Sequence, residues 1–332
     1  MSKRLITRRR AIAGAASAMA LAASGDRSAR AQSPLAGKTI KLIYPFAAGN
    51  SGDMVARLLG ERMQRILDAI VVVENRTGAA GRAGAQSVIR SVPDGTSLLL
   101  APLPLVSIYP HSYEKLGYDP VADLVPISQV AVFDVTFVAG PNPGLHSLSE
   151  LIAWVKANPS LATYGSSGAG GFAHLFAVMF ARNTAVNMTH VAYRGSAPVV
   201  SDVMAGQIPF ASVVSGDCIE LHRAGKVRML GVSGRSRLSV APDVPTFAEA
   251  GIPIDGTGWY GLYAPSKTPA DVVAVLARAA KEAMADPLAR QRVEHLALAL
   301  TGTGPEQLAR MQREASALWA PVVAASGFKP DQ

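Results

Sequence analysis

The sequence predicts an α/β protein of two lobes, and three observations support this class. Short β-prone segments alternate with segments whose apolar residues recur every three or four positions, the pattern of parallel strands joined by helices. The alternation occurs twice, over 39–101 and over 148–233. Breaks rich in Pro and Gly near 140 and 255 predict two crossings, giving a discontinuous domain 1 (34–136 and 257–332) and a domain 2 (137–256). Clefts between such lobes commonly bind small ligands.

Residues 1–31 have the composition of an export signal peptide. A basic start, an apolar run over 11–23 and a small-residue cleavage site before Gln32 predict secretion and cleavage near Ala31-Gln32. Arg8-Arg9-Arg10 also resembles a twin-arginine signal, so the route stays open between twin-arginine and general export. Cleavage removes seven of the 32 Lys and Arg and one of the 24 Asp and Glu, which lowers the net charge from +8 to +2. This small charge gives no support to nucleic acid binding.

The first strand-loop-helix unit has a strand from Ile40 to Tyr44, a loop of small residues and a helix. The helix is predicted from seven apolar residues on one face: Met54, Val55, Leu58, Leu59, Met63, Ile66 and Leu67. Either Asn50 or Ser51 can be its N-cap, and Asp53 in the first turn suits the positive end of the helix dipole. Exposed N–H groups at such an end favour a carboxylate or a phosphate. An ordinary strand-to-helix turn is the competing interpretation.

The rest of domain 1 is predicted from similar patterns. Its elements are strands at 70–74 and 97–101, a helix within 77–90, a long loop over 102–125, a strand over 127–139, a return strand at 258–264, and helices at 269–285, from 287, and at 305–325.

Domain 2 repeats this arrangement. Its elements are helices at 148–157 and 216–224, strands at 162–164, 189–193, 208–214 and 227–233, a Gly-rich loop at 165–171 leading into a helix through 180, and a helix after the loop 194–198. Ser196 is the expected N-cap of that last helix, with Pro198 tolerated in its first turn. This unit provides a second helix N-terminus suited to an anion.

No catalytic or cofactor motif stands out. The glycines of 165–171 fit a dinucleotide fingerprint poorly, and no Gly-x-Ser-x-Gly elbow is present. The six histidines show no metal-ligand spacing, so we expect no metal and no cofactor. His174 near the Gly-rich loop is expected to be a hydrogen-bonded structural residue. The single Cys218 is expected to be buried and structural.

Short motifs spread over the mature chain resemble one family. They are Pro45-Phe46-Ala47-Ala48-Gly49, Glu74-Asn75-Arg76, Pro93-Asp94-Gly95, Tyr118-Asp119-Pro120, Tyr164-Gly165-Ser166-Ser167-Gly168, Tyr193-Arg194-Gly195-Ser196-Ala197-Pro198, Ala224-Gly225-Lys226 and Pro242-Asp243-Val244-Pro245-Thr246. From about residue 38 to residue 329 the chain resembles the Bug-type receptors, the extracytoplasmic solute-binding proteins of the tripartite tricarboxylate transporter family.

The resemblance implies a two-lobed periplasmic binding protein of type II (Venus-flytrap) with a ligand cleft between the lobes. It also implies that two strand-loop-helix units hold a ligand carboxylate. The implied binding residues are Phe46, Ala47, Ala48, Gly49, Asn50, Ser51 and Asp53 in the first unit, Gly195, Ser196, Ala197 and Pro198 in the second, and Ser166, Ser167 and Gly168 in the adjoining wall.

Three positions depart from the family pattern. Asn50 replaces a common glycine and can still adopt a positive φ. Val213 stands where many relatives have Asp, which argues weakly for a ligand without an amino group. The apolar stretch 101–107, ending in Ser107, is expected to shape an aromatic or aliphatic pocket.

The leading functional hypothesis is capture of a small carboxylate (di- or tricarboxylate, or aromatic) in the periplasm by lobe closure, followed by delivery to a tripartite tricarboxylate-type permease. An orphan receptor that signals occupancy to a membrane sensor is the alternative. A periplasmic enzyme is a third hypothesis, which the lack of a recognisable set of catalytic residues disfavours. A monomer is the default expectation for the oligomeric state.

Overall fold

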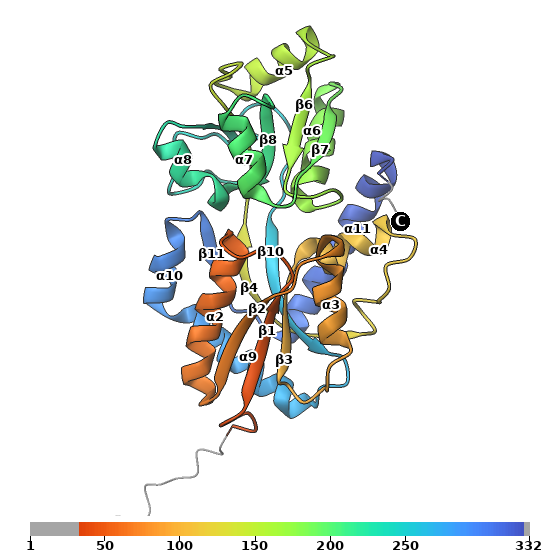
Figure 1. Ribbon diagram of the computed structural model, residues 1–332, viewed down its shortest axis with the longest axis vertical. Helices are drawn as coiled ribbons and strands as arrows, with labels where there is room; N and C mark the ends of the chain where they lie inside the picture. Colours follow the sequence, from red (N-terminus) through yellow and green to blue (C-terminus); the bar gives the residue numbers. More distant parts are fainter. Residues whose placement is uncertain (1–32, 329–332) are drawn as a thin grey trace, which may run out of the picture.

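The computed structural model describes residues 33–328 and contains two lobes, one above the other in Figure 1. A six-stranded sheet forms the centre of the first lobe and a five-stranded sheet that of the second. The predicted α/β class is therefore confirmed. Over residues 33–328 the helices are all too short or too polar to cross a bilayer. The predicted export signal at 1–31 lies outside the described residues.

The first sheet has the strand order β11-β4-β10-β3-β1-β2. Its strands are β1 (Thr39–Tyr44), β2 (Ile70–Asn75), β3 (Ser97–Pro102), β4 (Leu124–Phe133), β10 (Gly258–Pro265) and β11 (Leu298–Leu300). β1 pairs in parallel with β2 and β3, whereas β10 is antiparallel to β3 and β4. The helical elements of this lobe are α2 (Ser51–Leu67), η1 (Ala79–Gly81), α3 (Arg82–Ile89), η2 (Pro104–Ile108), α4 (Tyr109–Ser112), α9 (Ala270–Ala285), α10 (Pro287–Glu294) and α11 (Pro305–Ser326).

The second sheet has the order β7-β6-β8-β5-β9. Its strands are β5 (Val135–Ala139), β6 (Thr163–Ser166), β7 (Thr189–Ala192), β8 (Phe210–Val214) and β9 (Arg228–Val232). The helical elements are α5 (Leu148–Ala157), α6 (Phe172–Thr184), α7 (Ser196–Met204), η3 (Ser215–Asp217) and α8 (Ile219–Arg223). α5 has the predicted bounds, and β6 pairs in parallel with β7 and β8.

Three predicted elements differ from the structure. The strand expected over 127–139 is interrupted at Asp134, because the chain leaves the first sheet at Phe133 and enters the second at Val135. The loop expected over 102–125 contains η2 and α4. The helix expected over 216–224 is split into η3 and α8. The domain limits near 136 and 257 stay a proposal.

The apolar face of α2 packs against the first sheet, as its spacing predicts. Val55, Leu59 and Met63 are buried, and Gly60 lets the helix approach β2 closely. The spacing also predicts Met54 on this face, but the residue is 41% exposed. It lies beside Asp53 in the first turn, where the helix approaches the second lobe.

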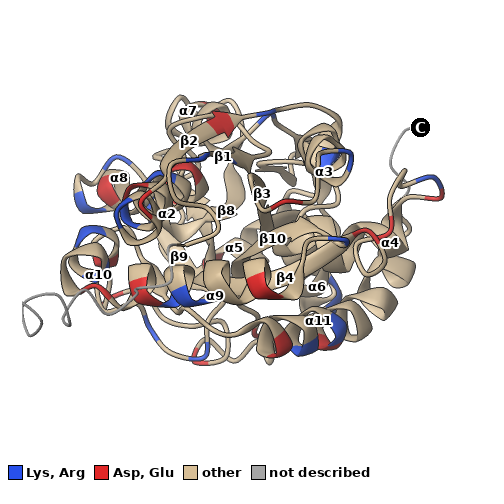
Figure 2. Cartoon of the chain, turned by 90° about the horizontal axis from the view of Figure 1, so that it is seen from below, with Lys and Arg blue, Asp and Glu red and all other residues tan. Residues whose placement is uncertain are grey.

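The long helix α11 contacts both lobes. It packs on β4 and η2 of the first lobe, and its Trp319 ring lies 5.4 Å from the Phe172 ring of α6. In Figure 1 it lies to the right of the molecule, while α2 lies to the left. Charged residues of both signs are intermixed on the outer helices α2, α8, α10 and α11 (Figure 2).

Candidate functional site

The N-terminus of α2 is capped by its own loop. Asn50 is the N-cap, and its side-chain oxygen accepts a hydrogen bond from the Asp53 amide at 3.0 Å. Of the two residues predicted for this role, Asn50 is the one used. Its φ of −95° is ordinary, and the positive φ of the loop falls instead on Gly49. The cap satisfies one of the free amides at the start of the helix.

Asp53 holds this loop in place. Its carboxylate accepts hydrogen bonds from Gly49 N at 3.0 Å, Arg57 Nε at 3.0 Å and Asn75 Nδ2 at 2.9 Å. Burial raises the pKa of the carboxyl, but these hydrogen bonds outweigh it and leave the pKa below its ordinary value. Because both of its carboxylate oxygens are hydrogen-bonded within the first lobe, Asp53 stabilises the conformation of the loop.

Two buried tyrosines, Tyr44 and Tyr260, pack beneath the first turn of α2, Tyr44 against Gly52 and Tyr260 against Tyr44. A side chain at Gly52 would overlap the Tyr44 hydroxyl, so only glycine fits there. Burial, together with the nearby charge of Asp217, raises the pKa of Tyr44. Tyr260 is likewise buried, with its pKa raised well above the ordinary value by burial and by Tyr44 and Asp217. Both phenols are therefore neutral hydrogen-bonding groups.

The N-terminus of α7 in the second lobe is built differently. Gly195, with φ +111°, is the N-cap residue, and Ser196 is the first residue of the helix. The prediction of Ser196 as N-cap is thus wrong, because Ser196 is already helical and Gly195 is the last residue before the helix. The helix has no side-chain cap. The Ser196 hydroxyl instead donates to Asp217 Oδ2 at 2.5 Å.

Asp217 joins the two helix ends. Besides Ser196, its carboxylate accepts hydrogen bonds from the Ser51 amide at 2.9 Å and from the Ser51 hydroxyl, both through Oδ1. Ser51 begins α2 of the first lobe, whereas Ser196 and Asp217 belong to the second. The sequence reasoning missed Asp217, although its position after a strand and before a short helix is a place where functional side chains gather.

The adjoining wall predicted at Ser166, Ser167 and Gly168 is the end of β6 and the loop that follows it. Ser166 is buried, and its hydroxyl lies 2.7 Å from His190 Nε2 and 3.0 Å from the Gly168 carbonyl oxygen. The rings of His174 and His190 stack with centroids 3.9 Å apart, and His174 Nδ1 accepts from the Gly170 amide at 3.0 Å. Burial lowers the pKa of His174 to about 3 and that of His190 to about 4. This pair is neutral, and His174 has the structural role that the sequence predicts.

Most of the other predicted site residues are at least partly exposed, in the two loops and the first turn of α7: Phe46, Ala47, Ala48, Gly49, Ser167, Gly168, Ala197 and Pro198. Ser107 does not join them, since it is fully buried and its hydroxyl donates to the Gln312 carbonyl oxygen of α11 at 3.1 Å. Val213 is buried in the core of the second lobe, and the expectation of a ligand without an amino group stays a prediction. Cys218 is buried as predicted, and burial raises its pKa.

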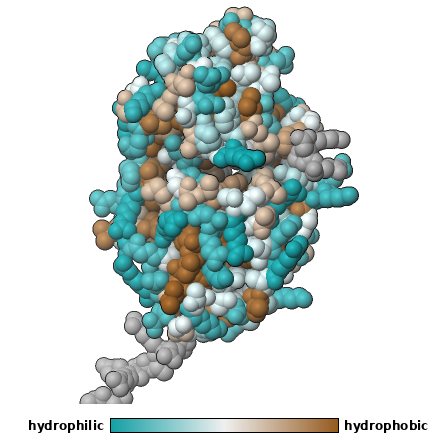
Figure 3. All heavy atoms as spheres, viewed as in Figure 1, coloured by the Kyte–Doolittle hydropathy of each residue, from teal (hydrophilic) through white to brown (hydrophobic). Residues whose placement is uncertain are grey.

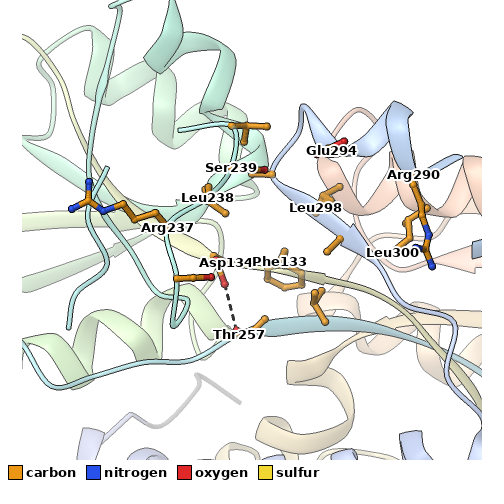
Figure 4. A pocket seen from close by; sticks show the side chains of 15 residues that line it. Phe133, Asp134, Arg237, Leu238, Ser239, Thr257, Arg290, Glu294, Leu298 and Leu300 are labelled. Carbon is orange, nitrogen blue, oxygen red and sulfur yellow. Dashed lines mark hydrogen bonds between the residues drawn. The ribbon is translucent and has the colours of Figure 1, made fainter. Parts of the chain in front are cut away.

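A cavity of about 510 Å³ lies beside the crossing strands, away from the facing helix ends. Figure 4 shows Asp134 directed toward Thr257, while Arg237 and Arg290 extend away on opposite sides. Burial raises the pKa of Asp134 to about 6, and the Thr257 hydroxyl is 3.4 Å from its carboxylate. A second cavity of about 530 Å³ lies in the second lobe around Pro141 and Lys226. Neither of these two cavities is lined by a residue of the predicted binding loops.

The space-filling view shows the surface hollowed between the lobes (Figure 3). Among residues 33–328, no group of three His, Cys, Asp or Glu side chains is placed to hold a metal ion. The site thus consists of two helix N-termini that face each other from different lobes, with hydroxyl and amide donors directed toward an acidic group.

Two mixed sheets joined by crossing strands, with such a site between them, define a solute receptor of the periplasmic binding protein class. The chain belongs to the tripartite tricarboxylate transporter family receptors, whose family model matches residues 55–328. This is a family of solute-binding receptors, not of enzymes.

Several known proteins are similar to this chain. A protein encoded in the tcbD-tcbE intergenic region of Pseudomonas sp. (strain P51) is 31% identical over 320 residues, covering 95% of this chain and 93% of its own. BugT of Bordetella pertussis is 34% identical over 74% of this chain and 76% of its own.

Three solved structures have the same fold. Periplasmic binding protein BugD matches with a TM-score of 0.82 and 30% identity, over 88% of this chain and 98% of its own. MatC from Rhodopseudomonas palustris with bound malate matches at 0.80 and 28%, over 86% and 99%. An R. palustris protein with adipate matches at 0.85 and 26%, over 89% and 99%.

Proposed function

We propose that this protein is a periplasmic receptor that captures a small carboxylate by lobe closure and delivers it to a permease of the tripartite tricarboxylate transporter type. The observation that carries the proposal is the pair of facing helix ends. Ser51 and Ser196 direct hydroxyl and amide donors from different lobes toward one carboxylate position. Charge-assisted hydrogen bonds of this kind, at helix N-termini, suit an anion. The malate and adipate bound to two similar proteins support the same ligand class.

The location follows from the same proposal. Residues 1–31 have the features of an export signal, and cleavage near Ala31-Gln32 would release the mature receptor into the periplasm.

The first test is thermal unfolding of the mature protein with mono-, di- and tricarboxylates, aromatic acids, amino acids and uncharged compounds. A ligand that binds only the folded state raises the midpoint by mass action. We expect shifts with carboxylates, and shifts with uncharged compounds alone would refute the proposal.

A charged variant localises the binding. Ala197 is exposed in the first turn of α7, so Ala197→Glu places a negative charge beside the proposed carboxylate position. A Glu there suits the helix dipole, so the fold should not suffer. We expect the ligand-induced shift to be lost. Ala324→Glu, on the exposed face of α11, is the matched control and should keep it. Equal shifts in both variants would place the ligand elsewhere.

Delivery is tested with the permease in proteoliposomes. Uptake of the radiolabelled carboxylate should require this receptor outside the vesicle, and Ala197→Glu should abolish it. Uptake that is independent of the receptor would favour a signalling role instead.

A further inference from the structure

The acidic group between the facing helix ends is part of the chain itself. Asp217 uses both carboxylate oxygens, Oδ1 toward Ser51 in the first lobe and Oδ2 toward Ser196 in the second. Within residues 33–328, Asp217 takes part in no ion pair with Lys, Arg or His. Its charge is therefore balanced by hydrogen bonds and by the positive end of α2.

The backbone around Asp217 fixes this position. The Ser215 amide donates to the Asp134 carbonyl oxygen at 2.9 Å, and the Cys218 amide donates to the Ser215 carbonyl oxygen at 3.2 Å. A side chain at Gly216 would collide with the Leu296 carbonyl oxygen and approach the Ser51 hydroxyl, so this loop lies directly against the first lobe. The backbone on both sides of Asp217 is therefore fixed by contacts within the fold, and Asp217 does not lie on a freely moving loop.

A carboxylate ligand needs the donors that Asp217 already uses. The Ser51 amide and hydroxyl both donate to Asp217, and a second carboxylate at the same place would meet like-charge repulsion at close range. A ligand carboxylate that takes the Ser51 donors must therefore replace Asp217 there. Each further negative charge on the ligand adds to the repulsion.

We infer that Asp217 is the specificity-determining residue of this site, an internal carboxylate that links the two lobes through Ser51 and Ser196 and that a ligand carboxylate displaces from Ser51. The displacement rests on the proposed function, whereas the link between the lobes does not. The residue weakens carboxylate binding in general and weakens it most for ligands with several negative charges.

The link is tested by the distance between the lobes in protein without added ligand. Spin labels at Val92→Cys in the first lobe and Leu161→Cys in the second use exposed positions, and the native Cys218 is buried. We expect pulsed electron spin resonance to show a broader, longer distance distribution in Asp217→Asn and Asp217→Ser. Asp68→Asn removes the same charge at the exposed far end of α2, in a left-handed position that Asn tolerates, and should match the parent. Unchanged distributions in both Asp217 variants would overturn the link.

The displacement is tested by calorimetric titration with malate, adipate and citrate. We expect Asp217→Asn to bind the dicarboxylates about tenfold more tightly, equal to about 1.4 kcal/mol, and to gain more for citrate. Asp68→Asn should bind as the parent does. Equal or weaker binding by Asp217→Asn and Asp217→Ser would overturn displacement and make Asp217 a contact of the ligand. If no variant binds any of these anions, the proposed function fails, while the distance measurement still decides the link.

Discussion

The two helix ends that face each other are completed in different ways. α2 has 17 residues and is capped by Asn50 from its own loop, with Asp53 in its first turn. α7 has nine residues and no side-chain cap, and its first hydroxyl bonds to Asp217 from a later segment. The first end is therefore capped within its own unit, although Ser51 also bonds to Asp217, whereas the second has no side-chain cap and its first hydroxyl bonds to Asp217.

The surroundings of the two ends differ in charge as well. Asp53, Arg57 and Asn75 form a charged network in the first lobe. The wall next to α7 instead relies on the neutral, stacked pair His174 and His190. A network built on a carboxylate keeps its contribution to the free energy of unfolding until the pH is low enough to protonate the carboxylate. A histidine that is buried and neutral in the folded state lowers the free energy of unfolding as soon as the pH is low enough for the unfolded chain to bind a proton.

The largest expected effect is therefore a pH dependence located in the second lobe. The folded pKa of His190 is about 4 and its ordinary value is 6.5, so between these values the unfolded state binds more protons. The free energy of unfolding should fall by on the order of 2 to 3 kcal/mol for this group as the pH drops from 6.5 to 4. The Asp53 contribution, from a lowered pKa, is lost only below about 4.

Urea unfolding at pH 7 and pH 4.5 checks this. His190→Gln should lose less free energy of unfolding on acidification than the parent protein. His146→Gln, at an exposed position, is the control and should behave as the parent does. Parallel pH profiles for parent and His190→Gln would show that the histidine pair does not limit acid stability.

The next largest effect is expected at Gly52, where the first end packs on Tyr44. An added methyl group overlaps the tyrosine ring, so Gly52→Ala should lower the free energy of unfolding by about 1 to 3 kcal/mol. Gly168→Ala in the second lobe is the matched substitution, because no heavy atom lies within 4 Å of its added group and its φ is ordinary. Chemical denaturation of the two variants should separate them, and equal losses would contradict the close packing under α2.

A smaller effect is expected from removing the cap of α2. Asn50→Ala deletes the acceptor for the Asp53 amide and should cost about 1 kcal/mol. The measurement is the urea midpoint at pH 7 with an unchanged slope. A change below about 0.3 kcal/mol would show that the Asp53 network alone completes this end.

The smallest effect is expected at Ser196. Its hydroxyl does not cap α7, and Asp217 is partly exposed and keeps its bonds to Ser51. Ser196→Ala should therefore cost less than Asn50→Ala, below about 1 kcal/mol. A larger loss for Ser196→Ala would mean that the second end depends on this hydroxyl as the first depends on its cap.

Much of the fold could be predicted from side chains that lie close together in the sequence. The bounds of α5, the cap of α2 and the placement of two helix ends after β1 and β7 all follow from side chains close in sequence. Each depends on short-range hydrogen bonding or on apolar spacing, which a sequence displays directly.

Other features depend on distant contacts or on backbone angles. The apolar run through Asp134 gives no sign that the strand changes sheets there, and Gly195 reveals its positive φ only in the folded loop. Ser107 lies in an apolar stretch that packs under α11, 205 residues away. Asp217 meets Ser51 over a separation of 166 residues, so no local pattern could assign its partner.

The position of α11 has a mechanical consequence. α11 packs on the first lobe, and its Trp319 contacts Phe172 of α6 in the second lobe. A lobe movement that keeps this contact is a rotation about the α11 side of the molecule. The α2 side, at the opposite edge in Figure 1, then travels furthest. The hydrogen bonds between Ser51 and Asp217 lie far from this rotation axis, so even two such bonds oppose opening with a large torque.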